Sequence, residues 1–452
     1  MSTQPTATNN SVGNSLASVE HGSGDACGCL LSELVSCEYV DSDGSLVCCG
    51  GETIAAASHS LPVVEVHRDL QAVVLGGLGI LVEVTMRIVP TFNVRQDVYE
   101  KVPWSRLDEA IYLDAFFSEA YSVSVFTDFH CSGRLPSVWV KRKEELSTGG
   151  FPTPLPPAPT TLFAHALGAS GALATTPRHP NRAAPPSECT LQGEPAGPWC
   201  ERLSHFIPTA DPSDGDFHLH SEYFVSRDDA PEAIRALRGV GNFQVMKLLL
   251  VYVELRTVAA DELWLSPAYR RPSLAIHFVW NHDEKQVRMA LRTIESRLAP
   301  FNPRPKWGTV FNFAPEAVAT LYPKMQAYRE LVEELDSKGK FRDSFVERLV
   351  LGTNGEQEGE GETGSAPSLQ LQFEDAAPCP ALGSTVRGEC PRTYDLVHGR
   401  VGARQDKLAD VPPDVLERER LLAHNLRRPG GQVCYQAIDF LDGSGHVDSH
   451  NL

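Results

Sequence analysis

The sequence predicts an α+β fold, in which strand-rich segments and helix-containing segments follow one another along the chain. Apolar and polar residues alternate from Leu81 to Val89, which is typical of a strand with one buried face. Farther on, the strand-like run 220–225 is followed by an expected helix that begins near Asp228 with an early proline. The 452 residues are 42% hydrophobic and 22% charged, as in a globular protein with material for about two to three domains.

Charge and composition exclude several classes of protein. The 58 acidic residues outnumber the 40 Lys and Arg residues, and the net charge of −18 argues against nucleic acid as a partner. The longest apolar stretch, 73–82, is shorter than the roughly 20 residues of a transmembrane segment. No Lys or Arg precedes Arg68, so no targeting segment is recognisable, and the cysteines lack metal or redox spacing. We expect a soluble, cytoplasmic protein with reduced thiols, and peripheral membrane association stays open.

The first 95 residues predict a lead-in followed by strands. Residues 1–20 are rich in Ser, Thr, Asn and Gln, so we expect a flexible lead-in. Runs of β-branched residues at 30–47 and 63–90 predict strands, because such side chains favour the extended backbone. Asp43-Gly44 interrupts the first run and predicts a hairpin turn.

A second domain of mixed strands and helices is expected from residue 96 to residue 352. A helix is expected to start at Trp104, and a strand is expected at 122–127. The order strand, helix, strand then recurs between residues 220 and 298. A helix at 321–335 is the last regular element that the pattern predicts.

Two stretches are expected to lack regular structure. Prolines and glycines are dense between residues 148 and 188, which predicts a long irregular excursion from the second domain. Residues 353–452 begin with an acidic linker rich in Gly and Glu, and continue with weak periodicity. We expect the latter to be a poorly structured, disordered tail.

The glycine-rich segment 75–80 follows a strand and leaves two interpretations open. A dinucleotide-binding fingerprint is excluded, because its third glycine would fall on Val82 and no helix follows. Gly76, Gly77 and Gly79 therefore form a tight turn with a purely structural role, or they let backbone amides approach a ligand.

A second loop of small residues lies at His21-Gly22-Ser23-Gly24. Its N–H groups and the Ser23 hydroxyl suit a phosphate or a flavin, although ordinary loops have the same composition. A nucleophile elbow is excluded, because His21 stands where that motif has a glycine.

Glu254 and Arg256 lie two residues apart in an apolar strand, so they share one face of it. Because burial of either charge alone is costly, they form an ion pair at a sheet edge or point into a cavity. His277 lies in another apolar strand, as a core histidine or as a site residue. Two histidines and a glutamate share a face at 218–222, but no fourth ligand has suitable spacing, and we expect no metal site.

Eight segments, between about residue 17 and Gly352, occur in an order that is specific to one family. They are His21-Gly-Ser-Gly-Asp-Ala, Gly77-Leu-Gly-Ile-Leu-Val-Glu-Val-Thr85, Val94-Arg-Gln-Asp-Val-Tyr-Glu100, Gly197-Pro-Trp199, Ser221-Glu-Tyr-Phe224, Glu254-Leu-Arg-Thr-Val-Ala-Ala-Asp-Glu-Leu-Trp264, His277-Phe278 and Pro305-Lys-Trp-Gly308. In this order they resemble the FAD-dependent alditol (xylitol) oxidases and the related D-arabinono-1,4-lactone oxidases, which are vanillyl-alcohol-oxidase-type flavoproteins.

The resemblance implies a FAD-binding domain of two subdomains and a sheet-and-helix substrate domain that caps the flavin. It implies oxidation of a CH–OH group of a polyol or sugar lactone, with oxygen as acceptor and hydrogen peroxide as product. The residues that it places against the cofactor are His21, Gly22, Ser23, Gly24, Gly77, Gly79 and Ile80. Those that it places at the catalytic side are Glu254, Arg256, His277 and Thr309.

Two departures from the family pattern raise an alternative. The family has a lysine where this chain has Thr309, and Lys306 is expected on the opposite strand face unless Gly308 introduces a bulge. Family members also carry an N-terminal subdomain that grips the FAD pyrophosphate, whereas about twenty residues precede His21 here. We therefore expect an N-terminally truncated member, in which 21–95 form a remnant of the FAD-binding domain and hold any FAD non-covalently. The alternative is a non-catalytic remnant or interaction protein that retains the fold of the substrate domain, residues 96–352.

Overall fold

A computed structural model describes residues 12–50, 63–67, 75–130, 136–144, 159–207, 218–352 and 433–436. The chain divides into two compact units, Met1–Glu358 with Arg428–Leu452 and Gly359–Arg427, and all the described residues belong to the first. Most of the predicted lead-in, part of the predicted excursion and nearly all of the predicted tail lie outside the described residues. No helix in the described part of the chain is long and apolar enough to cross a bilayer.

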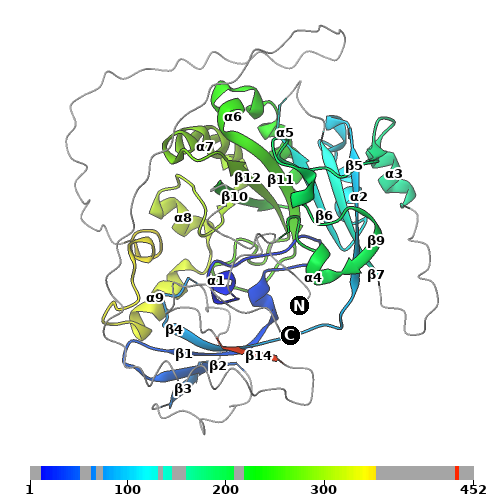
Figure 1. Ribbon diagram of the computed structural model, residues 1–452. Coiled ribbons are helices and arrows are strands. Elements are labelled where there is room, and N and C mark those ends of the chain that lie inside the picture. Colours follow the sequence, from blue (N-terminus) through cyan, green and yellow to red (C-terminus); the bar gives the residue numbers. More distant parts are fainter. Residues whose placement is uncertain are drawn as a thin grey trace, which may run out of the picture. The chain divides into compact units, whose positions relative to one another are not determined.

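A five-stranded sheet contains the first strands of the chain (Figure 1). Asp41 caps its tight hairpin turn, because the Asp41 carboxylate accepts hydrogen bonds from the N–H groups of Asp43 and Ser45 at 2.9 and 2.8 Å. Gly44 has a φ of +82°, which a residue with a side chain rarely adopts, so the hairpin turn predicted at Asp43-Gly44 is confirmed. In sheet order the strands are β14 (Val433–Gln436), β4 (Ile80–Met86), β1 (Leu34–Val40), β2 (Leu46–Cys49) and β3 (Val63–His67).

One expectation for this sheet is confirmed and one needs correction. The run 63–90, which Gly76 and Gly77 interrupt, forms two strands, β3 and β4, which lie at different places in the sheet. The short strand β14 belongs to the stretch that we expected to be poorly structured, yet it pairs with β4. Without β14, β4 would be an edge strand with unpaired backbone groups, and such an edge readily accepts one more strand.

A nine-stranded sheet forms the centre of the described part, and all its ladders are antiparallel. Strand β5 runs through residue 96, where we place the start of the second domain. In sheet order the strands are β13 (Arg304–Pro305), β10 (Leu219–Ser226), β12 (Ser273–Trp280), β11 (Leu250–Val258), β6 (Ser122–Thr127), β7 (Ser137–Glu144), β5 (Asn93–Glu100) and β8 (Ala172–Leu173), with β9 (Gly193–Pro198) also paired to β5.

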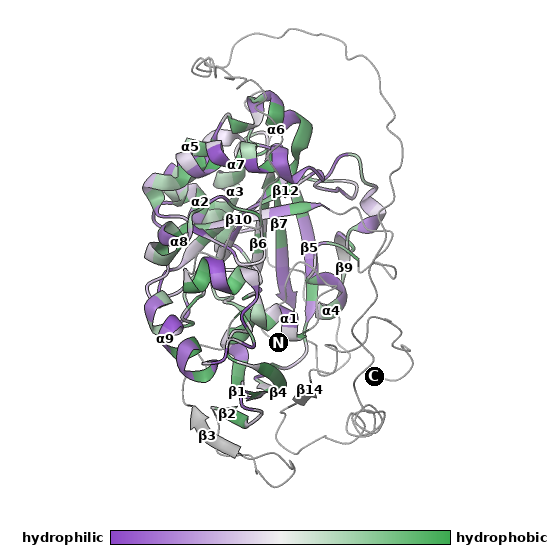
Figure 2. Cartoon of the chain, turned by 90° about the vertical axis from the view of Figure 1, so that its left-hand side faces the viewer, coloured by the Kyte–Doolittle hydropathy of each residue, from purple (hydrophilic) through white to green (hydrophobic). Residues whose placement is uncertain are grey.

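Helices pack on one face of the large sheet, and the chain around α4 and β9 lies on the other (Figure 2). Tyr223 of β10 points to the helical face, where it donates a hydrogen bond to Glu295 of α7 at 2.8 Å. The α-helices are α1 (Val12–Ala17), α2 (Ala110–Phe117), α3 (Thr161–Leu167), α4 (Trp199–Arg202), α5 (Ala230–Leu237), α6 (Gln244–Leu249), α7 (Glu284–Leu298), α8 (Pro315–Leu321) and α9 (Met325–Leu335). Short 3₁₀ or π turns are η1 (Leu30–Glu33), η3 (Trp104–Arg106), η4 (Pro186–Glu188), η6 (Val240–Asn242), η7 (Ala299–Phe301) and η8 (Val346–Leu351).

Several helix expectations need correction. The helix expected at 321–335 is α9, which begins at Met325, because Leu321 ends the separate helix α8. Helix α1 lies in the expected flexible lead-in, and α3 lies in the excursion expected to be irregular.

The helix expected near Asp228 is α5, which has Asp229 at its N-cap position and a proline in its first turn. At Trp104 the chain forms only the 3₁₀ turn η3, and α2 begins at Ala110. Tertiary contacts explain this difference, since Trp104 stacks on Phe129 in the core with 5.7 Å between ring centroids.

Candidate active site

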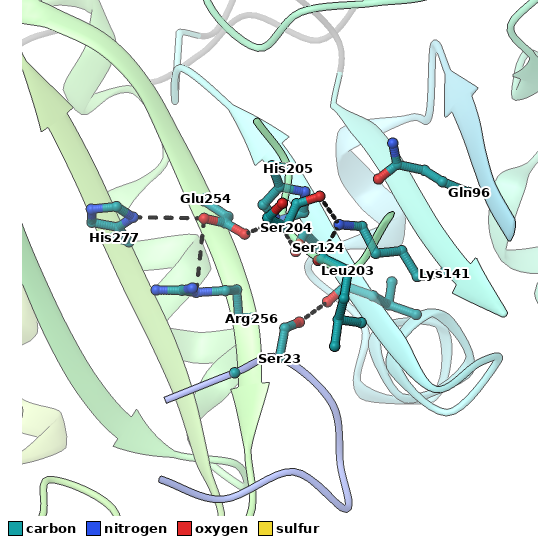
Figure 3. Close-up of polar contacts among 12 residues, drawn as sticks. Ser23, Gln96, Ser124, Lys141, Leu203, Ser204, His205, Glu254, Arg256 and His277 are labelled. Atoms are coloured by element: carbon teal, nitrogen blue, oxygen red, sulfur yellow. Dashed lines mark hydrogen bonds and ion pairs between the residues drawn. The ribbon is translucent and has the colours of Figure 1, made fainter. Parts of the chain in front are cut away.

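Four ionisable residues from three neighbouring strands meet on the face of the large sheet that the helices leave free, and Figure 3 shows three of them, Glu254, Arg256 and His277. In the strand register Glu222 of β10 and Glu254 of β11 both lie opposite His277 of β12, and directly opposite residues of an antiparallel pair share a face. Arg256 follows on the same face of β11. Only 2% of Glu222, Glu254 and Arg256 is exposed, so the cluster is screened from water.

Arg256 joins the two carboxylates. Its Nη2 lies 2.6 Å from Glu222 Oε1, and its Nε lies 3.8 Å from Glu254 Oε2. The predicted shared face of Glu254 and Arg256 is therefore confirmed, but the ion pair at a sheet edge is not found, because β11 lies between β12 and β6. Sequence reasoning did not find Glu222 as the closest partner of Arg256, although its alternation with Tyr223 and Phe224 already placed it on one face of β10.

The opposite charges of this cluster stabilise one another's ionised forms. Burial by itself raises the pKa of Glu222, but the charges of Arg256 and His21 outweigh burial and hold it well below its usual range. Burial likewise raises the pKa of Glu254, and Arg256 together with His205 reverses that effect. Burial lowers the pKa of Arg256, but Glu254 and Glu222 raise it by more, so the pKa of Arg256 lies above its usual value. The site therefore holds two carboxylates and one guanidinium in their charged forms.

The predicted cofactor loop His21–Gly24 packs against this cluster. The ring of His21 has Nδ1 at 2.8 Å from the Gly22 carbonyl and Nε2 at 3.1 Å from Glu222 Oε1, and both partners accept hydrogen bonds. His21 thus contacts the same Glu222 oxygen as Arg256 does. The Ser23 hydroxyl donates to the Val123 carbonyl at 2.8 Å. Both side chains are thus engaged inside the protein.

The predicted glycine turn at Gly77–Ile80 lies on the small sheet. A Cβ at Gly79 would stand 2.4 Å from the Val40 carbonyl oxygen, and a Cβ at Gly77 would stand 3.1 Å from the Tyr328 hydroxyl. Ile80 is 54% exposed. These close approaches explain the two glycines by packing within the chain, which favours the structural interpretation of this turn.

Thr309 lies in a turn beside β10. Its hydroxyl donates to the Lys306 carbonyl at 2.9 Å, and Gly308 has a φ of +75°. Because Trp307 and Gly308 form a turn, the alternation of strand faces that we assumed for Lys306 does not apply. Lys306 instead follows the short strand β13: its N–H donates to the Glu222 carbonyl at 2.8 Å, and its Nζ forms a buried ion pair with Glu20 at 2.6 Å.

His277 also contacts His220, one of the two histidines that share the strand face at 218–222. His220 Nδ1 lies 2.9 Å from His277 Nε2, and the two rings stack with 5.1 Å between centroids. The other nitrogen of His277, Nδ1, lies 3.6 Å from Glu254 Oε2. Among the residues that the structure describes, no group of three or more His, Cys, Asp or Glu side chains is arranged to hold a metal ion.

His205 is a site residue that sequence reasoning missed. It follows α4, and its Nε2 lies 2.8 Å from Glu254 Oε1 and 3.1 Å from Ser124 Oγ. Nothing in the spacing of the sequence indicates this contact, because His205 lies in an irregular segment 49 residues before Glu254. Only its proximity to the Gly197-Pro-Trp199 segment could have drawn attention to it.

A cavity of about 510 Å³ opens next to the cluster. Phe126 and Tyr252, which line it, flank Glu254 in the sheet: Phe126 is opposite Glu254 in the register, and Tyr252 precedes it by two positions. His218, Asp128 and Asn281 add polar groups to the lining. None of the four cluster residues lines this cavity.

Two polar groups of the site fit one side of a flavin. His277 Nδ1 is buried and makes no hydrogen bond of normal length to the described residues, and Arg256 provides a fixed positive charge two positions from Glu254. A polar ring edge that accepts hydrogen bonds and gains negative charge on reduction would match these groups. At Gly77–Ile80 the structure shows no comparable cradle, because Val40 fills the space beside Gly79.

Comparison with known proteins identifies similar chains. The sequence model of the D-arabinono-1,4-lactone oxidase family matches residues 217–349. An alditol oxidase of Streptomyces sp. is 34% identical over 344 residues, which cover 76% of this chain and 74% of that protein. The L-gulonolactone oxidase of Mus musculus is 23% identical over 132 residues, 28% of this chain and 30% of the relative. The crystal structure of a cholesterol oxidase from Brevibacterium sterolicum, 14% identical, has a similar fold with a TM-score of 0.52, over 77% of this chain and 76% of that one.

Proposed function

The chain belongs to the alditol oxidase family of FAD-linked oxidases, and on this premise we propose that it oxidises a CH–OH group of an alditol or an aldono-1,4-lactone. D-arabinono-1,4-lactone is the representative lactone, oxygen is the acceptor, and hydrogen peroxide is the product. FAD is bound non-covalently in this proposal. The observation that carries it is the buried cluster of Glu222, Glu254, Arg256 and His277 on one face of the large sheet.

FAD, when bound, supplies the hydride acceptor and is reoxidised by oxygen. In our proposal the loop His21–Gly24 contacts it, residues 21–95 contribute to its binding domain, and residues 96–352 form the substrate domain. His21 supports the non-covalent assignment, because both nitrogens of its ring already bind Gly22 and Glu222.

The chain's own contribution to the reaction is positional and electrostatic. Glu254 stays ionised and accepts a hydrogen bond from the substrate hydroxyl, which fixes the carbinol carbon in place. Because the pKa of Glu254 is well below its usual range, it orients that hydroxyl and is a weak base toward its proton. Arg256, held by Glu222, stabilises the negative charge that develops as the proton is lost.

Thr309 favours a second candidate function. The family resemblance places Thr309 at the catalytic side. Its hydroxyl, however, donates to the Lys306 carbonyl, and the side chain carries no charge. A chain with the family's fold and a weakened charge pattern could serve as a non-catalytic interaction protein. Catalytic measurements on the purified full chain separate the two candidates.

The test compares two buried carboxylates on opposite sides of the large sheet, Glu254 of β11 and Glu295 of α7. Peroxide formation is measured with added FAD and either xylitol or D-arabinono-1,4-lactone in the parent, Glu254→Gln and Glu295→Gln. Glu295 lies on the helical face, where it accepts a hydrogen bond from Tyr223. We expect Glu254→Gln to lower turnover at least about 10²-fold and Glu295→Gln to change it less than about threefold. Equal losses, or a parent that binds FAD and produces no peroxide, would contradict the proposal.

A further inference from the structure

We propose that His205 is a positioning residue of this site, which binds one oxygen of Glu254 so that the other oxygen faces the substrate hydroxyl. This inference rests on the proposed function, because it concerns how Glu254 is presented to substrate. The contacts of Glu254, the packing of the His205 ring and the anchoring of its backbone each support it.

The two oxygens of Glu254 differ in their contacts (Figure 3). Oε1 lies 2.8 Å from His205 Nε2, which is a normal hydrogen bond. Oε2 lies 3.6 Å from His277 Nδ1 and 3.8 Å from Arg256 Nε, which are ionic contacts longer than hydrogen bonds. Since His205 engages one oxygen, Oε2 is the oxygen with capacity to accept a hydrogen bond from a ligand.

The hydrogen bond defines the tautomer of His205. Glu254 is an ionised acceptor, so Nε2 must carry the proton, and Nδ1 is then an acceptor. Nδ1 is buried and has no hydrogen-bond partner among the described residues. Burial, followed by the charge of Lys141, lowers the pKa of His205 to about 4. The ring is therefore neutral at pH 7 and gives Glu254 a donor without adding a charge.

Hydrogen bonds to three consecutive carbonyls hold the backbone at His205 in place. Lys141 Nζ donates to the carbonyls of Leu203 and Ser204 at 2.5 and 2.8 Å. Thr190 donates from its hydroxyl to the Ser204 carbonyl at 2.8 Å and from its N–H to the His205 carbonyl at 3.0 Å. These hydrogen bonds hold the backbone of a segment that lacks regular secondary structure.

Aromatic side chains fix the ring itself. His205 lies edge-to-face against Phe126 and Trp139, with 5.3 and 5.6 Å between ring centroids. Both residues belong to the face of the sheet that carries Glu254. The side chain is thus oriented before any ligand binds, as a group that positions a reacting residue has to be.

Charged and titratable groups surround Glu254 on every side that packs against it. Arg256 comes from its own strand, His277 from β12 and His205 from the segment after α4. Lys141 of β7 acts electrostatically on both His205 and Glu254, and His21 and Glu222 lie beyond Arg256. Removing the His205 donor removes one of the effects that lower the pKa of Glu254, so that pKa rises.

The experiment compares three variants of the full chain with FAD and the better of the two substrates. His205→Leu removes the donor, and His205→Gln keeps an N–H at a similar reach. His179→Leu is the matched control, because the His179 ring packs on Phe206, the residue after His205, and bonds the Asn181 carbonyl. We expect His205→Leu to lower kcat about tenfold and to move the acidic limb of kcat/KM upward by about one pH unit. His205→Gln should recover part of both effects, and His179→Leu should show neither.

A measurement without turnover keeps this test separate from the proposed function. In the ¹⁵N spectrum of the histidine-labelled full chain, we expect one ring with its proton on Nε2 that stays neutral from about pH 5 to pH 8 and is absent in both His205 variants. A parent without oxidase activity that shows this ring would refute the proposed function alone. The role of His205 would be overturned if the ring signal that both His205 variants lose titrates near pH 6.5 in the parent. It would also be overturned if an active His205→Leu enzyme keeps the acidic limb of the parent.

Discussion

Two buried carboxylates share one guanidinium at the centre of the candidate site. Arg256 is 2.6 Å from Glu222 and 3.8 Å from Glu254, and it is the largest influence that keeps both ionised against burial. Depressed carboxyl pKa values contribute stability above the pKa of the unfolded chain, and this contribution is lost as pH falls through the folded values. The cluster therefore links the stability of the fold to the charge state that the proposed chemistry needs.

Replacing Arg256 should reveal this link. We expect Arg256→Met to lower the free energy of unfolding at pH 7 by about 3–5 kcal/mol, because it leaves two buried carboxylates without their cation. Burial then raises their pKa values, so they become protonated on acidification and the difference from the parent shrinks as pH falls toward about 4. Urea unfolding at both pH values measures this. A difference that is the same at pH 7 and pH 4 would show that Arg256 acts through packing alone.

Some site residues could be predicted from the sequence and others could not. The shared face of Glu254 and Arg256 follows from their spacing of two in a strand, and the structure confirms it. His205 and Glu222 reach the same site through contacts over 49 and 34 residues, which local periodicity does not encode. Strand alternation does not apply to Lys306 and Thr309, because Gly308 turns the chain between them.

At the scale of elements, the loop that carries His21 is attached to the end of strand β11. The Gly24 N–H donates to the Thr257 carbonyl at 2.9 Å, so the loop forms a single β-bridge with the end of β11. Gly24 has a φ of +139°, and a Cβ there would stand 2.3 Å from the Tyr121 carbonyl oxygen. Only glycine allows this approach, which brings His21 to Glu222.

Adding a methyl group at Gly24 tests whether this close approach to Tyr121 holds the loop His21–Gly24 in place. We expect Gly24→Ala to destabilise the fold by about 3 kcal/mol, from backbone strain and from the clash with Tyr121. Gly44→Ala is the control, because Gly44 also has a positive φ but a Cβ there would meet nothing within 4 Å, and strain alone should cost about 1 kcal/mol. Thermal unfolding of both variants provides the comparison. Equal losses would mean that the contact with Tyr121 does not constrain the loop.

Regular elements were predictable where local signals agreed with tertiary contacts. The hairpin at Asp43-Gly44 and helix α5 combine turn or capping residues with the right apolar spacing. Where a helix was expected at Trp104, the chain forms only a 3₁₀ turn, because Trp104 packs on Phe129. The local sequence pattern does not reveal this contact. The pairing of β14 with β4 joins strands that are hundreds of residues apart, and no local signal indicates it.

At the scale of the whole described part, the site depends on segments distant in the chain. His21 bonds Glu222 across 201 residues, and Lys306 bonds Glu20 across 286. The residues that fix Glu254 come from β11, β12 and the segment after α4. The α+β class and the family relationship could be predicted from the sequence because both rest on patterns along it, whereas this assembly depends on the completed fold.

We propose that the assembled chain, with bound FAD, oxidises a polyol or an aldonolactone. The most direct test is the visible absorbance spectrum of the full chain after it has been mixed with FAD and separated from unbound cofactor. Xylitol or D-arabinono-1,4-lactone is then added in the absence of oxygen. We predict a retained flavin band that bleaches with substrate and returns when air is admitted, and Arg256→Met should slow the bleaching at least about 10²-fold. A protein that retains no flavin, or a flavin band that neither substrate bleaches, would contradict the account.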